Sequence, residues 1–154
     1  MSKIEIGKKA PPFSLEGTAG TWSLDDAKGA AVVIYFYPRD NTSGCTQEGL
    51  DFAALHAQFK KSKAVVLGIS PDSVASHEKF KKKMTFPFEL LSDPDQKVCS
   101  LYGVFKEKSM YGRKYMGVER STFLIDAKGV LRHEWRKVKV KEHAETVLAA
   151  VKAL

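Results

Sequence analysis

The sequence predicts an α/β fold, with a mixed central sheet flanked by helices and an N-terminal β-hairpin extension. Two observations support this. Apolar runs rich in β-forming residues at 30–37 and 64–70 alternate with segments of helical periodicity, an order typical of a mainly parallel sheet. Towards the C-terminus, two short runs flank the turn sequence "DAKG", which indicates an antiparallel hairpin.

The first half of the chain is expected to form a hairpin, then two buried strands with a helix between them. Short strands at 13–15 and 21–24 are joined by a segment that contains glycine. The continuous apolar character of 30–37 and 64–70 indicates strands that are buried on both faces. Residues 45–61 carry apolar side chains near helical spacing and should form one amphipathic helix.

Two further helices are expected after these strands. Asp72 should cap a helix that runs to about Met84. In "FPFELLSDPDQKV" a short strand should be followed by a helix with Asp93 as its N-cap and Pro94 at its first position. This helix should end near Tyr102, where a glycine follows.

Strands at 121–125 and 130–135 and a terminal helix at 141–154 complete the predicted elements. Their order is the pattern of the thioredoxin-like fold with an N-terminal extension. A chain of 154 residues has the size of one domain, so residues 1–154 are expected to form a single domain.

The composition is that of an ordinary globular protein, with 44% hydrophobic and 28% charged residues. Neither a membrane-spanning apolar run nor a secretory signal is visible, so we expect a cytoplasmic protein that does not bind membranes. The net charge is +7, and residues 104–154 contribute +6, from twelve Lys and Arg against six Asp and Glu. Because no aromatic-basic pattern accompanies these charges, they indicate a solvated basic face and no nucleic-acid partner.

The stretch "YFYPRDNTSGCTQEG" places Cys45, one of only two cysteines, between a buried strand and a helix. In a reducing compartment such a cysteine is either inert core or reactive. With Thr42 or Ser43 as N-cap, Cys45 falls in the first helical turn, where free N–H groups and the helix dipole favour a thiolate. We expect this junction to be partly open. A helix start can instead bind anions without any chemistry, so position alone leaves both interpretations open.

The residue three positions before Cys45 indicates which kind of reaction the cysteine can perform. Thioredoxin-type reductants carry C-x-x-C at this junction, whereas here the first position is Thr42. A hydroxyl cannot form a disulfide, but it can hold a proton or an oxygen near the sulfur, which suits a one-thiolate reaction with an oxygen substrate. The four histidines show no metal-ligand spacing, and no nicotinamide, flavin or haem motif is visible. No cofactor or metal is expected, because the sulfur itself carries the redox change.

The full motif, Pro38-x-x-x-Thr42-x-x-Cys45-x-x-Glu48, resembles that of the peroxiredoxins, and within them the bacterioferritin comigratory protein or Q subgroup. The segments "LGIS", "LLSD", "YGV" and "RSTFLID" match the same family, so the resemblance covers nearly the whole chain from about Ile6. It implies a thiol-dependent peroxidase that reduces hydrogen peroxide and organic hydroperoxides in antioxidant defence.

The resemblance also implies a role for each site residue. Cys45 matches the peroxidatic cysteine, whose thiolate attacks the peroxide and becomes a sulfenic acid. Thr42 matches the hydroxyl that bonds the thiolate and the peroxide oxygens, and Pro38 matches the residue that shields the pocket. Arg120 matches an arginine whose charge stabilises the thiolate and whose guanidinium donates to the peroxide, and Glu48 should orient it. Without the resemblance, we would interpret Arg120 as an arginine at the end of a strand and Glu48 as a carboxylate on the surface of a helix.

Regeneration of the cysteine is where this chain departs from many members of the subgroup. They carry a resolving cysteine five residues after the first or in the next helix, but here Leu50 occupies the former position and 73–84 contains no cysteine. Cys99 is expected to be buried core. The resemblance therefore implies a monomeric one-cysteine peroxiredoxin, reduced by thioredoxin or by glutathione with glutaredoxin. A Cys45–Cys99 disulfide, or a thioredoxin-like module without peroxidase activity, remain as alternatives.

Overall fold

The structure is a computed structural model and describes residues 4–154. This part of the chain forms nine strands, five α-helices and a short 3₁₀ helix, η1. In chain order the elements are β1 (Ser14–Gly17), β2 (Gly20–Ser23), η1 (Leu24–Ala27), β3 (Ala31–Phe36), α1 (Ser43–Ala54), α2 (His56–Lys61), β4 (Ala64–Ser70), α3 (Val74–Met84), β5 (Glu89–Ser92), α4 (Lys97–Leu101), β6 (Phe105–Met110), β7 (Arg113–Val118), β8 (Ser121–Ile125), β9 (Leu131–Trp135) and α5 (His143–Lys152).

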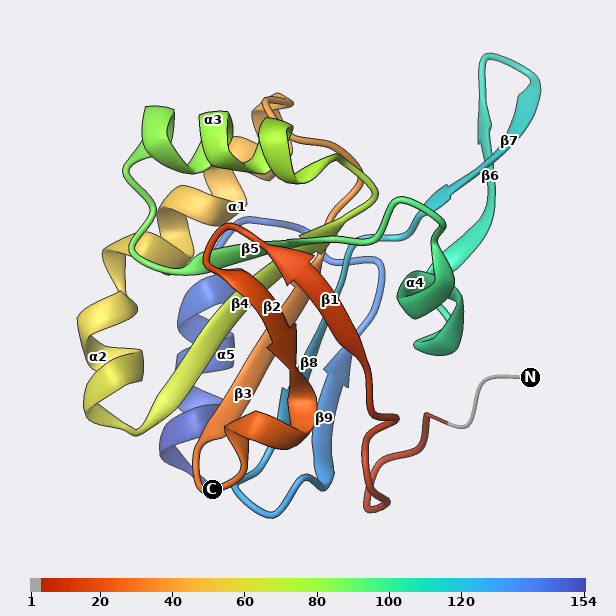
Figure 1. The fold of residues 1–154 in the computed structure, drawn as a ribbon. Helices are drawn as coiled ribbons and strands as arrows, with labels where there is room; N and C mark the ends of the chain where they lie inside the picture. The colour runs from red at the N-terminus through yellow and green to blue at the C-terminus, as the bar shows by residue number, and fades with distance from the viewer. Residues whose placement is uncertain (1–3) are drawn as a thin grey trace.

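Seven of the strands form one mixed sheet in the order β2-β1-β5-β4-β3-β8-β9 (Figure 1). The central strand β3 pairs in parallel with β4 and antiparallel with β8, and all six of its residues are buried. β4 pairs in parallel with β5, and β1 and β2 form an antiparallel hairpin at one edge. The predicted mixed sheet with an N-terminal hairpin is therefore confirmed.

Two apolar cores lie on opposite faces of this sheet. Val33 and Tyr35 of β3 join a cluster with α1, α2, α3 and α5, while the alternate residues Val32 and Ile34 join a second cluster with α4 and the N-terminal segment. In Figure 1, α1, α2 and α5 lie to the left of and behind the strands, whereas α4 lies on the right. Helices thus flank the sheet as the sequence predicts.

The single helix predicted for 45–61 is instead two helices, α1 and α2, which are divided at Leu55. The Leu55 N–H bonds the carbonyl of Phe52, three residues back, so the last turn is tighter than an α-helical turn. Phe52 and Phe59, on either side of the break, are both buried in the same core. The break lets both helices follow the face of the sheet.

Two predicted N-caps are wrong. α3 is capped by Ser73, because the carboxylate of Asp72 is already bonded to the loop that follows β3. α4 begins only at Lys97, so Asp93 is not its N-cap residue and Pro94 lies outside the helix. The Asp93 carboxylate nevertheless accepts hydrogen bonds from backbone N–H groups inside α4. This is the kind of interaction that an N-cap residue makes with its helix.

α4 carries Cys99, whose exposed fraction is 0%. The side chain packs in the core that includes Ile34 and Tyr102, and Tyr102 ends the helix as predicted. The expected core position of Cys99 is therefore confirmed.

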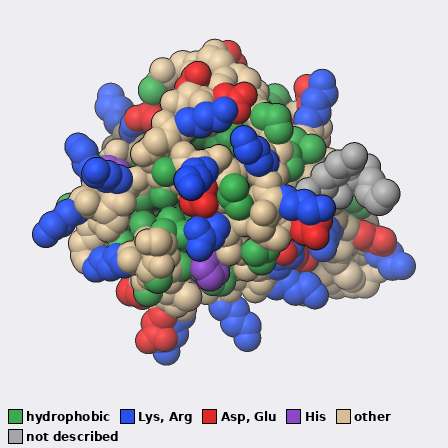
Figure 2. Space-filling view, turned by 90° about the horizontal axis from the view of Figure 1, so that it is seen from below, with side chains coloured by type: hydrophobic (Ala, Val, Ile, Leu, Met, Phe, Trp, Pro, Cys, Tyr) green, Lys and Arg blue, Asp and Glu red, His purple; other side chains and the backbone are tan. Residues whose placement is uncertain are grey.

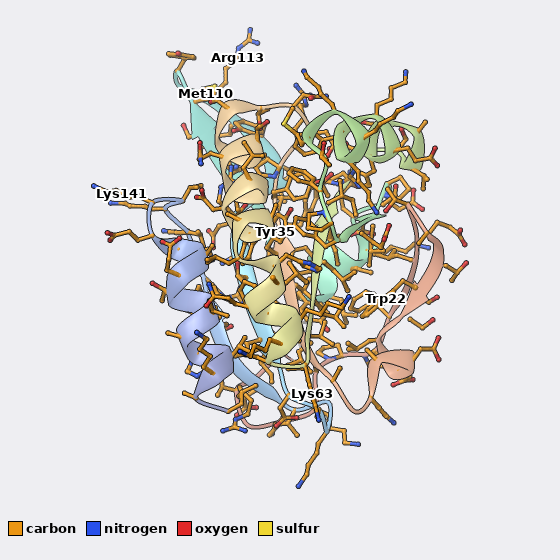
Figure 3. All side chains as sticks on the ribbon, turned by 90° about the vertical axis from the view of Figure 1, so that its left-hand side faces the viewer. Trp22, Tyr35, Lys63, Met110, Arg113 and Lys141 are labelled. Carbon is orange, nitrogen blue, oxygen red and sulfur yellow. The ribbon has the colours of Figure 1, made fainter. Side chains whose placement is uncertain are left out.

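The hairpin of β6 and β7 is not predicted by the sequence. Its strands pair only with each other, and most of its side chains are exposed. Figure 1 shows the hairpin projecting from the body, and Figure 3 places Met110 and Arg113 at its outer end. A strand pair that buries neither face needs no apolar alternation, which is the signal that indicates a strand in a sequence.

Lys and Arg side chains are dispersed over the face seen in Figure 2, with acidic side chains between them. On that face the basic residues form a solvated surface rather than one continuous patch. None of the helices in residues 4–154 is long and apolar enough to cross a membrane.

Candidate active site

Cys45 lies in the first turn of α1, as predicted. β3 leads into a loop of residues 37–42, and Thr42 is the N-cap residue, with an extended backbone (φ −83°, ψ 153°). The first N–H groups of a helix have no partner within the helix, so this turn favours negative charge on the sulfur. The Thr42 hydroxyl makes no capping hydrogen bond with the helix. It donates to the carbonyl of Arg39 at 2.9 Å, which leaves its oxygen able to accept a hydrogen bond.

The expectation that Cys45 is partly open is wrong, because its exposed fraction is only 2%. The side chain belongs to the core that contains Tyr35 and Phe52. Figure 3 shows Tyr35 in the middle of the molecule, beside the helix that carries Cys45. Only a small reactant can meet the sulfur here, unless the first turn of α1 moves.

Arg120, in the short link between β7 and β8, is brought to Cys45 by the fold. Its Nη2 lies 3.2 Å from the Cys45 sulfur, and its Nη1 lies 2.6 Å from Oε1 of Glu48. Glu48 is one helical turn beyond Cys45 on α1, so both partners of the guanidinium come from the same helix face. The structure thus brings together three of the five residues that the sequence singled out.

Glu48 is buried, with an exposed fraction of 1%, and its Oε2 has no hydrogen-bond partner among the described residues. Burial raises the pKa of Glu48 to about 7, although the charge of Arg120 acts in the opposite direction. The carboxyl group therefore ionises close to neutral pH. The predicted contact of Glu48 with Arg120 is present, while the alternative of a solvated surface carboxylate is excluded by its burial.

Gly44 is a site residue that sequence analysis missed. A Cβ atom at this position would lie 3.2 Å from Nη2 of Arg120, which is tighter than ordinary packing. Gly44 therefore lets the guanidinium approach the first turn of α1 and reach the neighbouring sulfur. The signal was present in the sequence, since glycine is unfavourable inside a helix unless close approach requires it.

Pro38 and Thr42 lie at the two ends of the loop before α1. Pro38 is half-buried and follows Tyr37, whose N–H bonds the carbonyl of Ile69 in β4. This bond ties the start of the loop to the sheet. Pro38 therefore lies on the segment that leads to Cys45.

Two buried histidines near this region had no predicted role. His143 at the start of α5 bonds Thr122 of β8 at 2.8 Å, and burial, assisted by the charge of Arg120, lowers the pKa of His143 to about 4. His77 on α3 bonds Asp40, in the loop before α1, at 2.8 Å. A single histidine in a helical pattern has no spacing signal, so only the tertiary structure reveals these contacts.

Comparison with known proteins gives a consistent result. The AhpC/TSA family matches residues 6–134. Peroxiredoxin Bcp of Bacillus subtilis is 51% identical over 150 residues, covering 97% of this chain and 96% of the relative. Peroxiredoxin Bcp of Xanthomonas campestris is 52% identical over 142 residues, covering 92% and 88%. Among solved structures, peroxiredoxin Q of Xanthomonas campestris has a TM-score of 0.88 at 47% identity, covering 99% of this chain and 97% of that one.

The fold and the buried cysteine beside an arginine define a peroxiredoxin with a thioredoxin-like fold. The chain belongs to the AhpC/TSA family, and within it to the Bcp/Q subgroup of peroxiredoxins. It is accordingly a thiol peroxidase of antioxidant defence, with a peroxide as its substrate and a thiol as its reductant.

Proposed function

We propose that Cys45 is the peroxidatic cysteine of this thiol peroxidase and that an external thiol regenerates it. One observation carries the proposal: the Arg120 guanidinium lies 3.2 Å from the Cys45 sulfur at the start of a helix. A fixed positive charge and a helix N-terminus act on the same atom. Both favour the thiolate, which is the nucleophilic form of cysteine.

In the first step the Cys45 thiolate attacks one oxygen of the peroxide ROOH. A sulfur–oxygen bond forms as the O–O bond breaks, and the electron pair of that bond leaves on the second oxygen. This oxygen takes up a proton and departs as water or an alcohol, so the peroxide is reduced while the sulfur is oxidised to a sulfenic acid. In this mechanism Arg120 donates to the peroxide oxygens as negative charge moves onto them.

The remaining three residues position this reaction. We assign the Thr42 oxygen as the acceptor for the hydrogen of the incoming hydroperoxide, because its own proton is directed to a backbone carbonyl. Glu48 fixes Nη1 of Arg120 and so leaves Nη2 for the sulfur and the substrate. Pro38, half-buried at the other end of the loop, limits the access of water.

The proposed substrates are hydrogen peroxide and organic hydroperoxides. A solved structure at 46% identity and a TM-score of 0.88 was used to study alkyl peroxide reduction by the bacterioferritin comigratory protein of Xanthomonas campestris. The attacking atom in our mechanism bonds only to oxygen, so the group R affects the fit but not the chemistry.

Cys99 has no part in the proposed cycle. It lies in the core on the α4 face of the sheet, whereas Cys45 lies in the core on the opposite face. Burial, with the nearby Asp93 carboxylate, raises the pKa of the Cys99 thiol well above its ordinary value, which disfavours the reactive thiolate. A Cys45–Cys99 disulfide would require one of the two sulfurs to cross the sheet.

We propose that the sulfenic acid is instead resolved by an external thiol, from thioredoxin or from glutathione with glutaredoxin. The first thiol displaces water and forms a mixed disulfide with Cys45, and a second thiol then releases the Cys45 thiol and leaves as a disulfide. Leu50, at the position where many relatives carry a resolving cysteine, is partly exposed on α1 and offers no sulfur.

The proposal treats residues 1–154 as one domain that acts as a cytoplasmic monomer. The seven-stranded sheet with a core on each face supports one domain, because it contains strands from both ends of the chain.

Peroxide consumption with dithiothreitol as reductant tests the proposed function. Cys45→Ser should consume no peroxide above the uncatalysed rate, because a hydroxyl is not nucleophilic enough at neutral pH. Cys99→Ser, the matched control, should keep most of the activity. If a folded Cys99→Ser protein were as inactive as Cys45→Ser, the one-cysteine cycle would be wrong.

A further inference from the structure

A buried polar cluster lies beneath the loop that leads into α1. At its centre are Asp40 of that loop and His77 of α3, with exposed fractions of 6% and 0%. His77 Nδ1 lies 2.8 Å from Asp40 Oδ2, and its Nε2 lies 2.8 Å from the carbonyl oxygen of Leu91 in β5. The imidazole therefore bridges the loop and the sheet.

The His77 ring lies against two groups that only accept hydrogen bonds, the Asp40 carboxylate and the Leu91 carbonyl, and the Tyr37 hydroxyl lies 3.4 Å from Nδ1. Burial alone would raise the pKa of Asp40. Hydrogen bonds from His77 and Tyr37 outweigh this effect and hold the pKa of Asp40 below its ordinary value. The geometry thus describes a buried carboxylate held by hydrogen bonds from α3 and from the residue that follows β3.

Asp40 is fixed through its backbone as well as through its side chain. Its carboxylate also accepts from the Tyr37 hydroxyl at 2.6 Å and from the Ser76 hydroxyl at 2.7 Å. Its backbone N–H donates to Asp72 Oδ2 at 2.8 Å. The middle of the loop is therefore tied to the end of β3, to α3 and to the turn before α3.

The same cluster has the outline of a cation site, but its chemistry does not fit one. Ligand atoms of Asp40, Asp72 and His77 lie within 4.8 Å of one another. Both ring nitrogens of His77, however, already lie 2.8 Å from oxygen atoms of the chain. The hydrogen bonds among the three residues account for their proximity.

We propose that the hydrogen-bonded Asp40–His77 pair positions the loop before α1, and thereby holds the first turn of α1 where the Cys45 sulfur meets Arg120. Asp40 stands two residues before Thr42, the N-cap residue, so a shift of Asp40 displaces the start of the helix. His77 touches no reacting atom and is a positioning residue. The proposal rests on the assigned role of Cys45.

Two substitutions of His77 separate its two hydrogen bonds. The amide nitrogen of glutamine reaches the position of Nε2, so His77→Gln keeps the bond to Leu91 and loses the bond to Asp40. The amide nitrogen of asparagine reaches the position of Nδ1, so His77→Asn keeps the bond to Asp40. The matched control is Lys81→Gln, one turn further along α3, which breaks an ion pair of 2.7 Å with Glu89 of β5 and leaves the loop untouched.

Each variant is compared in a Cys99→Ser background by two measurements. One is the single-turnover rate of Cys45 oxidation by hydrogen peroxide. The other is amide hydrogen exchange, read at Asp40 and Thr46, whose N–H groups are bonded at the middle of the loop and in the first turn of α1. Exchange within β3 and β4 reports global unfolding, which a merely structural loss would accelerate equally.

His77→Gln should oxidise about tenfold more slowly and exchange about tenfold faster at Asp40 and Thr46, with β3 and β4 unchanged, since one charge-assisted hydrogen bond is lost. The oxidation rate and the amide exchange of His77→Asn should lie between those of His77→Gln and Lys81→Gln. Lys81→Gln should match the parent protein in both measurements. Equal rates in His77→Gln and Lys81→Gln, or exchange that rises uniformly across the sheet, would overturn the proposal.

If His77→Gln does not fold, Ser76→Ala removes one donor from Asp40 and should show the same selective change at a smaller size, about threefold. An unchanged Ser76→Ala protein would then overturn the proposal. A parent protein that is not oxidised at Cys45 would refute the proposed function instead, while the exchange data would still report on the Asp40–His77 pair.

Discussion

Cys45 and Cys99 lie in two different cores, on opposite faces of the central sheet. Cys45 packs with Tyr35 of β3, and Cys99 packs with the alternate residues of the same strand. Strand β3, whose six residues are all buried, contributes alternate side chains to the two cores and so lies between them. This relationship supports the proposal of a one-cysteine peroxidase, and the fate of oxidised Cys45 tests that proposal.

Arg120→Met tests the charge beside the sulfur. Methionine retains an extended side chain but has neither the positive charge nor the N–H groups of the guanidinium. Oxidation of Cys45 should slow by about a hundredfold or more, the usual cost of losing a donor to developing negative charge. Single-turnover oxidation by hydrogen peroxide, followed in a Cys99→Ser background, measures this rate. Equal rates in Arg120→Met and its parent would remove Arg120 from the site.

Gly44→Ala tests the close approach of Arg120 to α1. The added methyl group would lie 3.2 Å from Nη2, so the guanidinium must retreat by a few tenths of an ångström. Peroxide oxidation should slow by roughly tenfold, because small errors in position are costly at a reacting centre. Helical content should not fall, since alanine favours helix. Ser43→Ala, at the neighbouring exposed position, serves as the control, and equal rates for the two variants would refute this role.

Only part of the site could be predicted from the sequence, and the reasons are physical. Cys45 and Thr42 share one strand-to-helix junction, whose signals are local: a buried apolar run, a capping residue and helical spacing. Arg120 is 75 residues away from Cys45, and no local pattern marks it, so the family resemblance was needed to assign it. The Asp40–His77 pair escaped prediction because its partners are separated by 37 residues.

The fold was predictable where burial leaves a pattern. β3 and β4 bury nearly every residue and appear in the sequence as continuous apolar runs. The break between α1 and α2 has no proline or glycine to mark it, because it results from packing against the sheet. The N-cap of α3 was misplaced by one residue because Asp72 is bonded to a loop that is distant in sequence.

Glu48→Gln tests the pH dependence of the buried carboxyl group, in a Cys45→Ser background that removes the thiol titration. The folded-state pKa of Glu48, about 7, lies above the ordinary value of 4.5. Its contribution to stability is therefore fully present below about pH 4.5 and is lost as the pH rises through 7. The free energy of unfolding of Glu48→Gln, relative to its parent, should rise by about 1–3 kcal/mol between pH 5 and pH 8. Denaturant unfolding at both pH values measures this difference, and a constant difference would contradict it.

Leu50→Cys tests whether a resolving cysteine on α1 is all that the protein lacks to form an intramolecular disulfide with Cys45. Position 50 is one to two turns from Cys45, so a cysteine there can reach the sulfenic acid once the first turn of the helix unwinds. The variant should form an intramolecular disulfide after one equivalent of peroxide and should resist overoxidation to the sulfinic acid. Non-reducing peptide mapping detects the bond. Leu50→Ser, the control for lost leucine packing, should remain as sensitive to overoxidation as the wild type.

The most direct test of the one-cysteine account is peptide mass spectrometry of the wild-type protein after one equivalent of hydrogen peroxide, with dimedone present and no thiol. The account predicts a dimedone adduct on Cys45, an unmodified Cys99 thiol and, at higher peroxide without dimedone, a sulfinic acid on Cys45. A Cys45–Cys99 disulfide without any dimedone adduct would contradict it, since the two cores would then have to rearrange during turnover.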